Sequence, residues 1–409
     1  MTTADAREGT GTTTTGVRPW FVTGALTMVV VVALSLSSWY LLADPKWSLH
    51  HAYPFPVNAV LFWAILSVVF LGFNLEFWGF DRLTQPTKGL AIVATVVVMA
   101  IAITALLAAG LGHFDARFAA DRQDGTGYLA GALFVLFGFF TFVTAVVNWE
   151  HWPWASRGMR QPKKGLLEIG SMLVPTVIIY LILGLPTMAI KPGHTVLPLN
   201  TVIGWFYSII VAMLVTALMA ENWPWRLAGP GWKTAATSVA GNVALGTAIY
   251  FAFLSLAKAL IGSNTVHLLG PGIHSYPAQI GVCWAFWMIF WSNACTNFPN
   301  TASAARNYAA RIGTTLSLGI VTFLAYYHVI ARTALHEPVT AGNLNGNALG
   351  FIDWVILWTL FYVVCLESYG LRQPAELDAA ADEHVVTVPA SSEDDTEQWA
   401  EEEEAQTLR

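Results

Sequence analysis

Amide and carboxylate side chains recur at a regular spacing along the chain. Four segments share an aromatic pattern around an asparagine: FNLEFWGF, VNWEHWPW, ENWPWRLA and TNFPNTAS, at residues 73–80, 147–154, 221–228 and 296–303. Their asparagines, which lie 74, 74 and 75 residues apart, are Asn74, Asn148, Asn222 and Asn297. The glutamates in the same segments are Glu76, Glu150 and Glu221. If the segments meet in space, these side chains form a polar vestibule, which makes them candidate substrate-binding residues.

The same segments have a purely structural interpretation. Tryptophan is enriched at membrane–water interfaces, and proline ends a helix because it lacks the backbone N–H. Asparagine can cap free carbonyl groups or bridge neighbouring helices. A carboxylate near a membrane is costlier than a neutral cap, which favours a functional role for the glutamates. The sequence alone leaves both interpretations open.

Tryptophans at helical spacing suggest a second chemical feature. In the segment 281–298, Trp284, Trp287 and Trp291 fall on one helix face, and Asn293 follows them. Trp287, Trp291 and Asn293 are candidate substrate-binding residues, because an aromatic wall attracts organic or cationic solutes through cation–π contacts. Packing against other helices or lipid is the alternative.

Glu168 is a further candidate, because it lies about one turn inside an apolar run. A carboxylate there has either a functional role or a structural ion pair. Lys163 and Lys164 precede it on the same side of the membrane and are the expected partners in the second case.

Histidines gather on the opposite side of the predicted membrane. Eight of the ten histidines fall there: His50, His51, His113, His194, His267, His274, His328 and His336. Imidazole binds Zn, Cu or Ni and titrates near neutral pH. The candidate metal ligands are His50, His51, His267, His274 and His328. Because no HxxxH or HExxH pair exists, no single segment makes a metal site, and the sequence identifies no cofactor.

The composition places all these residues in a membrane protein. Of 409 residues, 55% are hydrophobic and 11% are charged, whereas about a quarter are charged in soluble domains. This composition excludes an ordinary cytosolic enzyme, a disordered chain and a nucleic-acid binder. The chain is therefore expected to contact the lipid bilayer along most of its length.

Ten apolar runs are long enough to cross a bilayer as helices, which need about 20 residues each. The runs are 19–43, 56–78, 89–111, 127–149, 165–187, 198–220, 236–260, 278–297, 310–334 and 348–368. The predicted fold is an all-α polytopic membrane protein with a ten-helix transmembrane domain at 19–370. A disordered segment at 1–18 precedes this domain, and a disordered tail at 371–409 follows it.

The distribution of cations orients the predicted helices. The side that holds both termini carries 13 Lys and Arg residues, whereas the other side carries six. The positive-inside rule therefore predicts a multi-pass protein of the cytoplasmic membrane with both termini in the cytoplasm. The tail has 12 acidic residues and one basic residue after position 372. It is expected to be solvated, or to bind a partner protein.

The regular spacing also predicts an internal repeat. The motifs QPTKG at 85–89 and QPKKG at 161–165 follow the first two aromatic segments, and RQP recurs at 372–374. The repeating unit is a helical hairpin of roughly 74 residues, used about five times. Because each unit has two spans, successive copies enter the membrane from the same side. The sequence does not decide whether the five hairpins close into a ring or pack as layers.

Function is predicted from this architecture and from missing motifs. The chain has no P-loop, no dinucleotide-binding glycine motif and no G-x-S-x-G motif. The sequence thus favours a non-enzymatic protein, without excluding an enzyme. The leading prediction is a permease for a small solute, with proton coupling as an option. The alternatives are a membrane-embedded metal or redox protein that uses the histidines, and a non-catalytic subunit of a larger complex. A homo-oligomer is compatible with each.

Overall fold

Prolines precede several long helices of this computed structural model. The residue before the first helical position is proline in five of them: Pro19, Pro56, Pro86, Pro162 and Pro198. Proline is favoured near a helix start because its φ is already close to the helical value and its missing N–H has no partner to lose there. The structure describes residues 19–122, 125–188 and 195–371. The predicted N-terminal segment and, apart from residue 371, the predicted acidic tail lie outside the described residues, so partner binding through the tail stays a prediction.

Five helices form the outer layer of the bundle: α1 (Trp20–Leu42), α3 (Thr87–Ala105), α6 (Lys163–Ile179), α8 (Trp232–Ile261) and α11 (Ala304–Ala325). Three of them continue into a π-helical turn, at Leu106–Leu111, Tyr180–Gly184 and Tyr326–Ile330. Only 17% to 33% of the residues in their most apolar windows are buried. Their exposed side chains include Val98, Phe251 and Val321, so these helices present apolar surface that is suited to lipid.

Five further helices lie inside this layer: α2 (Val57–Val68), α5 (Thr126–Val147), α7 (Leu199–Leu214), α10 (Tyr276–Ala294) and α13 (Ala348–Thr359). Three of these inner helices end in π-helical turns, at Val69–Asn74, Val215–Met219 and Leu360–Cys365. In α2, α5, α7 and α13, 61% to 83% of the residues in the most apolar window are buried.

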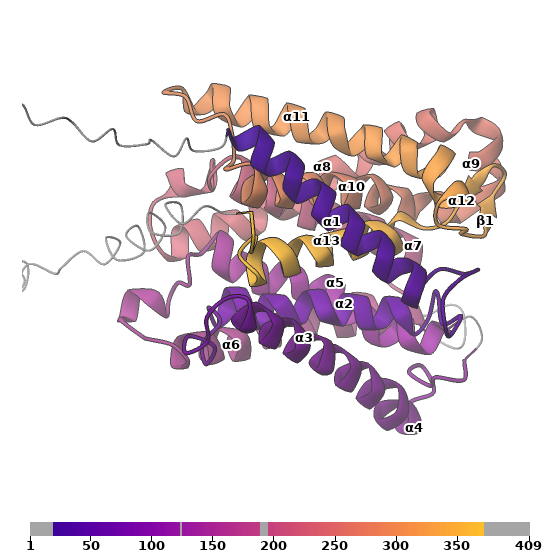
Figure 1. Ribbon diagram of the computed structural model, residues 1–409, viewed down its shortest axis with the longest axis horizontal. Coiled ribbons are helices and arrows are strands. Elements are labelled where there is room, and N and C mark those ends of the chain that lie inside the picture. The colour runs from indigo at the N-terminus through magenta and orange to yellow at the C-terminus, as the bar shows by residue number, and fades with distance from the viewer. Residues whose placement is uncertain (1–18, 123–124, 189–194, 372–409) are drawn as a thin grey trace, which may run out of the picture. The chain divides into compact units, whose positions relative to one another are not determined.

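The inner helices close into a ring. α2 packs on α5, α5 on α7, α7 on α10 and α10 on α13, which packs back on α2. The outer helices α3, α6, α8 and α11 each pack on the inner helix that precedes them, and α1 packs on α13 (Figure 1). α1 thus takes the place that a helix following α13 would occupy. We call the end of the ring where the inner helices start the amino end, and the other end the carboxyl end.

Nine helices in the described part of the chain are long and apolar enough to span a membrane. α10 is not among them, although the sequence predicts a span at 278–297. It carries Trp284, Trp287, Trp291 and Gln279, which lower its mean hydropathy. Because α7, α8, α11 and α13 surround α10, it can carry these polar and amphipathic side chains without exposing them to lipid.

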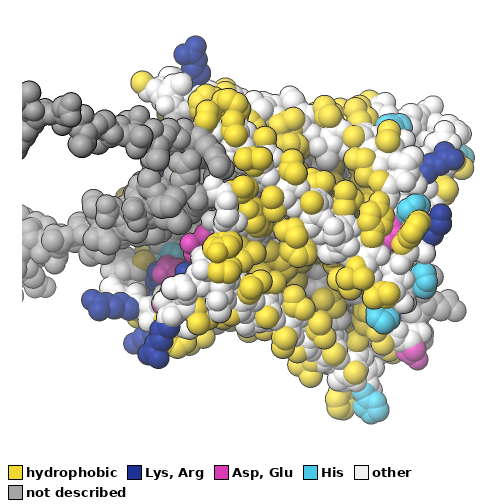
Figure 2. Space-filling model, in the orientation of Figure 1, with side chains coloured by type: hydrophobic (Ala, Val, Ile, Leu, Met, Phe, Trp, Pro, Cys, Tyr) yellow, Lys and Arg dark blue, Asp and Glu magenta, His cyan; other side chains and the backbone are white. Residues whose placement is uncertain are grey.

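Short elements cover the amino end. They are α4 (Gly112–Phe114), α9 (Ser263–Leu269), α12 (Ala331–Thr333) and a hairpin of two antiparallel strands, β1 (Val339–Ala341) and β2 (Leu344–Asn345). Figure 2 shows charged side chains at the two ends of the helices and a mainly hydrophobic surface between them, with histidines at the end that carries α4 and β1. This distribution is that of a multi-pass membrane protein.

All five inner helices end in the same backbone turn. Two consecutive residues with φ between 49° and 62° terminate each of them: Glu76–Phe77, Glu150–His151, Glu221–Asn222, Thr296–Asn297 and Glu367–Ser368. The left-handed region costs a residue with a side chain about 1–2 kcal/mol. The cost is offset because the second N–H of each pair donates to a carbonyl six residues earlier, as from Phe77 to Leu71 and from Ser368 to Tyr362. Carbonyl groups left free at the helix end thereby gain partners.

Candidate functional site

The ring of inner helices encloses a cavity of about 560 Å³ in its amino half. All five inner helices line it. The lining includes one apolar residue from each at an equivalent position in the chain: Ile65, Phe139, Ile210, Ala285 and Ile356. Each lies eleven residues before the first left-handed residue that ends its helix. The cavity is therefore bounded by corresponding positions of the five helices, as a site on the ring axis requires.

Polar groups from three inner helices meet in this cavity. Asp353 on α13 is only 5% exposed, and the hydroxyl of Tyr207 on α7 donates to its Oδ1 at 3.4 Å. Gln279 on α10 donates from Nε2 to Asn347 Oδ1 at 2.8 Å, and its Oε1 accepts from the Tyr327 hydroxyl at 3.0 Å. These side chains give an otherwise apolar cavity one buried carboxyl group and several neutral hydrogen-bonding groups.

Glu337, in the loop before β1, supplies a second carboxyl group at the amino end of the cavity. The Tyr326 hydroxyl donates to its Oε1 at 2.8 Å, while the Asn347 N–H and the Tyr53 hydroxyl donate to its Oε2 at 2.9 and 3.4 Å. Burial raises the pKa of Glu337 to about 7, although these three donors oppose the rise. Glu337 therefore changes its charge near neutral pH.

Sequence reasoning did not single out the polar residues of this cavity. Asp353 lies near the start of the predicted last span, where an interfacial position accounts for a carboxylate, and Glu337 lies in a loop. The available signal was an aspartate inside the run GFIDWVILW, which stands out because ionisable residues are rare within spans. Nothing in the sequence pairs Asp353 with Tyr207, since they lie 146 residues apart.

The asparagines of the repeated segments lie at the carboxyl end of the ring and do not line the cavity. Asn74 Nδ2 donates to the Phe142 carbonyl, which joins the ends of α2 and α5. Asn148 Nδ2 donates to Asn222 Oδ1 at 2.9 Å, and Asn222 Nδ2 returns a bond to the Asn148 carbonyl at 2.8 Å. Asn297 Nδ2 donates to the Leu218 carbonyl at 2.8 Å. These bonds join three successive pairs of inner helices, which favours the cap-and-bridge interpretation.

The equal spacing of the four asparagines does not make them equivalent. Asn74 and Asn148 lie two residues before the left-handed pairs of their helices, whereas Asn222 and Asn297 are the second residues of theirs. The expected correspondence of all four is therefore wrong. The cause is the distance from Glu150 to Glu221, which is three residues shorter than the distance from Glu76 to Glu150.

The QP-x-K-G motifs join the start of an outer helix to the end of an inner one. Gln161 Nε2 donates to the Asn74 carbonyl at 2.9 Å, and its Oε1 accepts from the Gly165 N–H at 3.1 Å. Gln85 makes the corresponding bonds, at 2.9 and 3.2 Å, with the Cys365 carbonyl and the Gly89 N–H. A side chain at Gly165 would collide with the Asn74 carbonyl, so the glycine permits this close approach.

Ion pairs add to the joints at the carboxyl end. Glu76 pairs with Lys164, and Glu367, the corresponding residue of α13, pairs with Lys88 at 3.4 Å. Glu150 is exposed.

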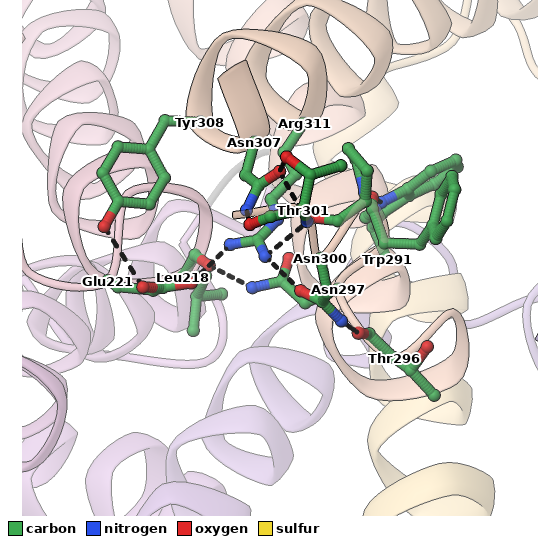
Figure 3. Close-up of polar contacts among 12 residues, drawn as sticks. Leu218, Glu221, Trp291, Thr296, Asn297, Asn300, Thr301, Asn307, Tyr308 and Arg311 are labelled. Carbon is green, nitrogen blue, oxygen red and sulfur yellow. Dashed lines mark hydrogen bonds and ion pairs between the residues drawn. The ribbon is translucent and has the colours of Figure 1, made fainter. Parts of the chain in front are cut away.

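The Glu221 carboxylate accepts from Arg311 Nη1 at 2.8 Å and from the Tyr308 hydroxyl at 3.1 Å (Figure 3). Arg311, 1% exposed, also donates to the Pro299 carbonyl and to Asn300. Hydrogen bonding to Arg311 lowers the pKa of Glu221. The candidate glutamates Glu76 and Glu221 thus form ion pairs with cations of outer helices.

Glu168 is buried at 1% exposure and pairs with a histidine. Its Oε2 lies 2.8 Å from His151 Nδ1, and His151 Nε2 lies 3.4 Å from Glu76. The expected ion pair of Glu168 with Lys163 or Lys164 does not form, because Lys164 reaches Glu76 instead. Glu168 thus joins α6 to the end of α5 and does not line the cavity.

The tryptophan face of α10 is turned toward outer helices. Trp284 Nε1 donates to Thr315 at 3.0 Å and Trp287 Nε1 donates to Thr322 at 2.8 Å, both on α11. Trp291 donates to the Phe298 carbonyl, and Asn293 is exposed and bonds to the Ile289 carbonyl of its own helix. Trp287 and Trp291 therefore do not form the wall of the cavity, because the opposite face of α10 lines it through Ala285 and Ile289.

The candidate metal ligands are dispersed. His50, His51, His267 and His328 are exposed, while His274 Nδ1 lies 2.8 Å from the Tyr250 hydroxyl. Among the described residues no three His, Cys, Asp or Glu side chains are placed to hold a metal ion. His194 lies outside the described residues. The metal alternative therefore gains no support from these positions.

The cavity and the carboxyl end thus hold different sets of side chains. The cavity has two buried carboxyl groups with neutral neighbours, and the carboxyl end has amide bridges and ion pairs that hold helices together. No protein-family model, curated protein or solved structure matches the chain, so its function has to follow from its own residues.

Proposed function

We propose that the protein is a ten-span permease that moves a small solute along the axis of the inner ring. The observation that supports this proposal is the cavity of about 560 Å³ bounded by one helix from each of five hairpins. Its volume lies within the range of about 300–1,000 Å³ that is typical of small-molecule sites. Its polar groups are few and convergent, which is the usual character of such a site.

The ten spans of this proposal are five copies of one unit. The five left-handed turns support the repeat, because in the described part of the chain such pairs end inner helices only and bear the same relation to the cavity. In the proposed unit, α10 is the inner helix of the fourth copy and crosses the membrane although its hydropathy is low. In a parallel repeat of this kind, a solute site falls on the shared axis near the membrane midplane.

We place the carboxyl end of the ring on the cytoplasmic side of the inner membrane. Among described residues, ten Lys and Arg lie on that side: Arg82, Lys88, Arg157, Arg160, Lys163, Lys164, Arg226, Lys233, Arg306 and Arg311. The opposite side has Lys46, Arg117, Arg122, Lys258 and Arg332. The bias supports cytoplasmic termini.

The apolar level of the cavity is the proposed barrier to free diffusion. Ile65, Phe139, Ile210 and Ile356 are large, whereas Ala285 leaves space beside them. Apolar constrictions gate pathways by excluding water. A solute would bind in the amino half and cross this level when the ring changes conformation.

The experiment uses the purified chain in lipid vesicles. The vesicles are incubated with a pool of small metabolites at equal concentrations, and their contents are measured by mass spectrometry. At least one solute should enter faster than in protein-free vesicles. Ala285→Trp should slow its entry at least about tenfold, because the indole fills the cavity.

The matched control is Ala102→Trp, which places the same side chain on an exposed face of α3. This variant should transport like the unmodified chain. Identical vesicle contents with the unmodified chain, with Ala285→Trp and without protein would contradict the proposal.

A further inference from the structure

The charged groups that line the cavity have one sign. Asp353 and Glu337 are 5% and 3% exposed and both line it. Among the cavity-lining residues that the structure describes, none is Lys, Arg or His. A carboxylate in a low-dielectric site is costly unless a cation or a proton compensates it. The described lining of the cavity thus lacks a positive charge that would neutralise the two carboxylates.

The missing positive charge matters most for the carboxyl group of Asp353. Among the described residues, its side chain accepts one hydrogen bond, from the Tyr207 hydroxyl, which is long at 3.4 Å. The nearby titratable groups are Tyr207 and Cys283, and neither can carry a positive charge. An ionised Asp353 therefore needs a positive charge from something that enters the cavity.

The rest of the lining matches the other requirements of an organic cation. The rings of Tyr53, Tyr276 and Tyr327 and three phenylalanines border the cavity, and aromatic faces attract alkylated ammonium groups. Asn58 also lines it and is 6% exposed. Its Oδ1 is buried without a hydrogen-bond partner in the described part of the chain. This free acceptor can receive a hydroxyl or N–H of a bound molecule.

The inner helices start near the cavity, and helix N-termini favour anions. This effect amounts to about half a charge per helix and falls off within the first turn. The two carboxyl groups carry full charges when ionised and lie in the lining itself. The side chains therefore decide the sign of the solute.

We infer that the cavity binds a small organic cation whose positive group lies against Asp353. The inference rests on the permease proposal, because it assigns a substrate class to the same cavity. Asn58 and the tyrosine rings contact the rest of the bound molecule. The carboxylates at the carboxyl end take no part, since Glu76, Glu221 and Glu367 already pair with cations of the chain.

The test compares two probes of the same shape in binding to the purified full chain. Choline is the cation, and 3,3-dimethylbutan-1-ol replaces its nitrogen by carbon. Calorimetry at pH 8 should give a Kd for choline at least tenfold lower than that for the neutral probe. Asp353→Asn should weaken choline binding at least tenfold and leave the neutral probe unchanged. Glu150→Gln removes a carboxylate at the carboxyl end and should alter neither value.

Two results overturn the inference: equal affinity for the two probes, or choline binding that survives Asp353→Asn. A thermal unfolding curve of Asp353→Asn that matches the unmodified chain shows that lost binding is not lost folding. Failure of the permease proposal looks different. In that case choline binds in an Asp353-dependent way, but radiolabelled choline does not enter vesicles that contain the protein.

Discussion

The two ends of the inner ring differ in what their polar residues do. At the carboxyl end, amides and charged groups have partners on neighbouring helices, as between Asn148 and Asn222 or between Glu221 and Arg311. In the amino half, Asp353 and Asn58 line a cavity, and the hydrogen bond from Tyr207 to Asp353 is long at 3.4 Å. We infer that the repeated residues hold the ring together. The residues suited to solute binding stand where the copies differ.

The positions that correspond to Asp353 on the other inner helices illustrate this difference between the copies. Fourteen residues before each left-handed pair stand Phe62, Leu136, Tyr207, Val282 and Asp353. Four of these line the cavity, and two are polar. Apolar residues at all five positions would give an apolar ring without a polar side. The polar residues on α7 and α13, the two helices that flank α10 in the ring, create a polar site on one side of the axis.

The largest effect on stability is expected at Arg311. Arg311→Met removes the guanidinium bonds to the Pro299 carbonyl and to Glu221 and should reduce the free energy of unfolding by about 2–3 kcal/mol. The loss is below that of a fully buried pair because Glu221 is half exposed. Lys88→Met is the matched control, since Lys88 is 22% exposed whereas Arg311 is 1% exposed, and should cost under about 1 kcal/mol. Chemical denaturation in detergent measures both, and equal losses would remove the distinction.

Asn222 tests the amide bridges. Asn222→Leu removes two hydrogen bonds with Asn148 and places a branched side chain at φ 62°. The expected loss is about 2 kcal/mol of unfolding free energy, with Kd for the solute unchanged. Asn293→Leu, at an exposed position, serves as control. A changed Kd with intact stability would show that the carboxyl end binds solute.

Much of the fold could be predicted from the sequence, and much of the site could not. Apolar runs and prolines are local signals, so helix positions follow from them, as for α1 and α3. The closing of the ring depends on contacts between α13 and α2, which no local pattern encodes. The repeated Asn and Glu residues stood out because they recur. Asp353 and Glu337 belong to no repeated motif. They become candidate binding residues only when the fold brings Tyr207, Asn58 and Asn347 beside them.

A smaller effect is expected from pH at Glu337. With a pKa raised to about 7, its carboxyl group is neutral below that pH and negative above it. Choline affinity should therefore increase several-fold as pH rises through 7, and Glu337→Gln should abolish the increase. The groups that face Glu337 are Tyr53, Tyr326 and Asp44, and His336 pairs with Asp44 at 2.9 Å. An unchanged pH profile in the variant would contradict the assignment of the titration to Glu337.

The smallest effect is expected at the exposed glutamates. Glu76→Gln and Glu150→Gln, singly and together, should leave solute uptake within about twofold of the unmodified chain, because neither residue lines the cavity. The single Glu76 variant should lose under about 1 kcal/mol of stability, as surface ion pairs do. Loss of uptake in the folded double variant would return these residues to the candidate substrate-binding set.

The location of a bound cation distinguishes the two ends most directly. A crystal structure of the full chain with arsenocholine, in which arsenic replaces the nitrogen of choline, gives the position of the cation from anomalous scattering. The expected arsenic peak lies inside the ring beside Asp353 and disappears in Asp353→Asn. A peak at Glu76, Glu150 or Glu221, with none inside the ring, would contradict the assignment of the cavity as the solute site.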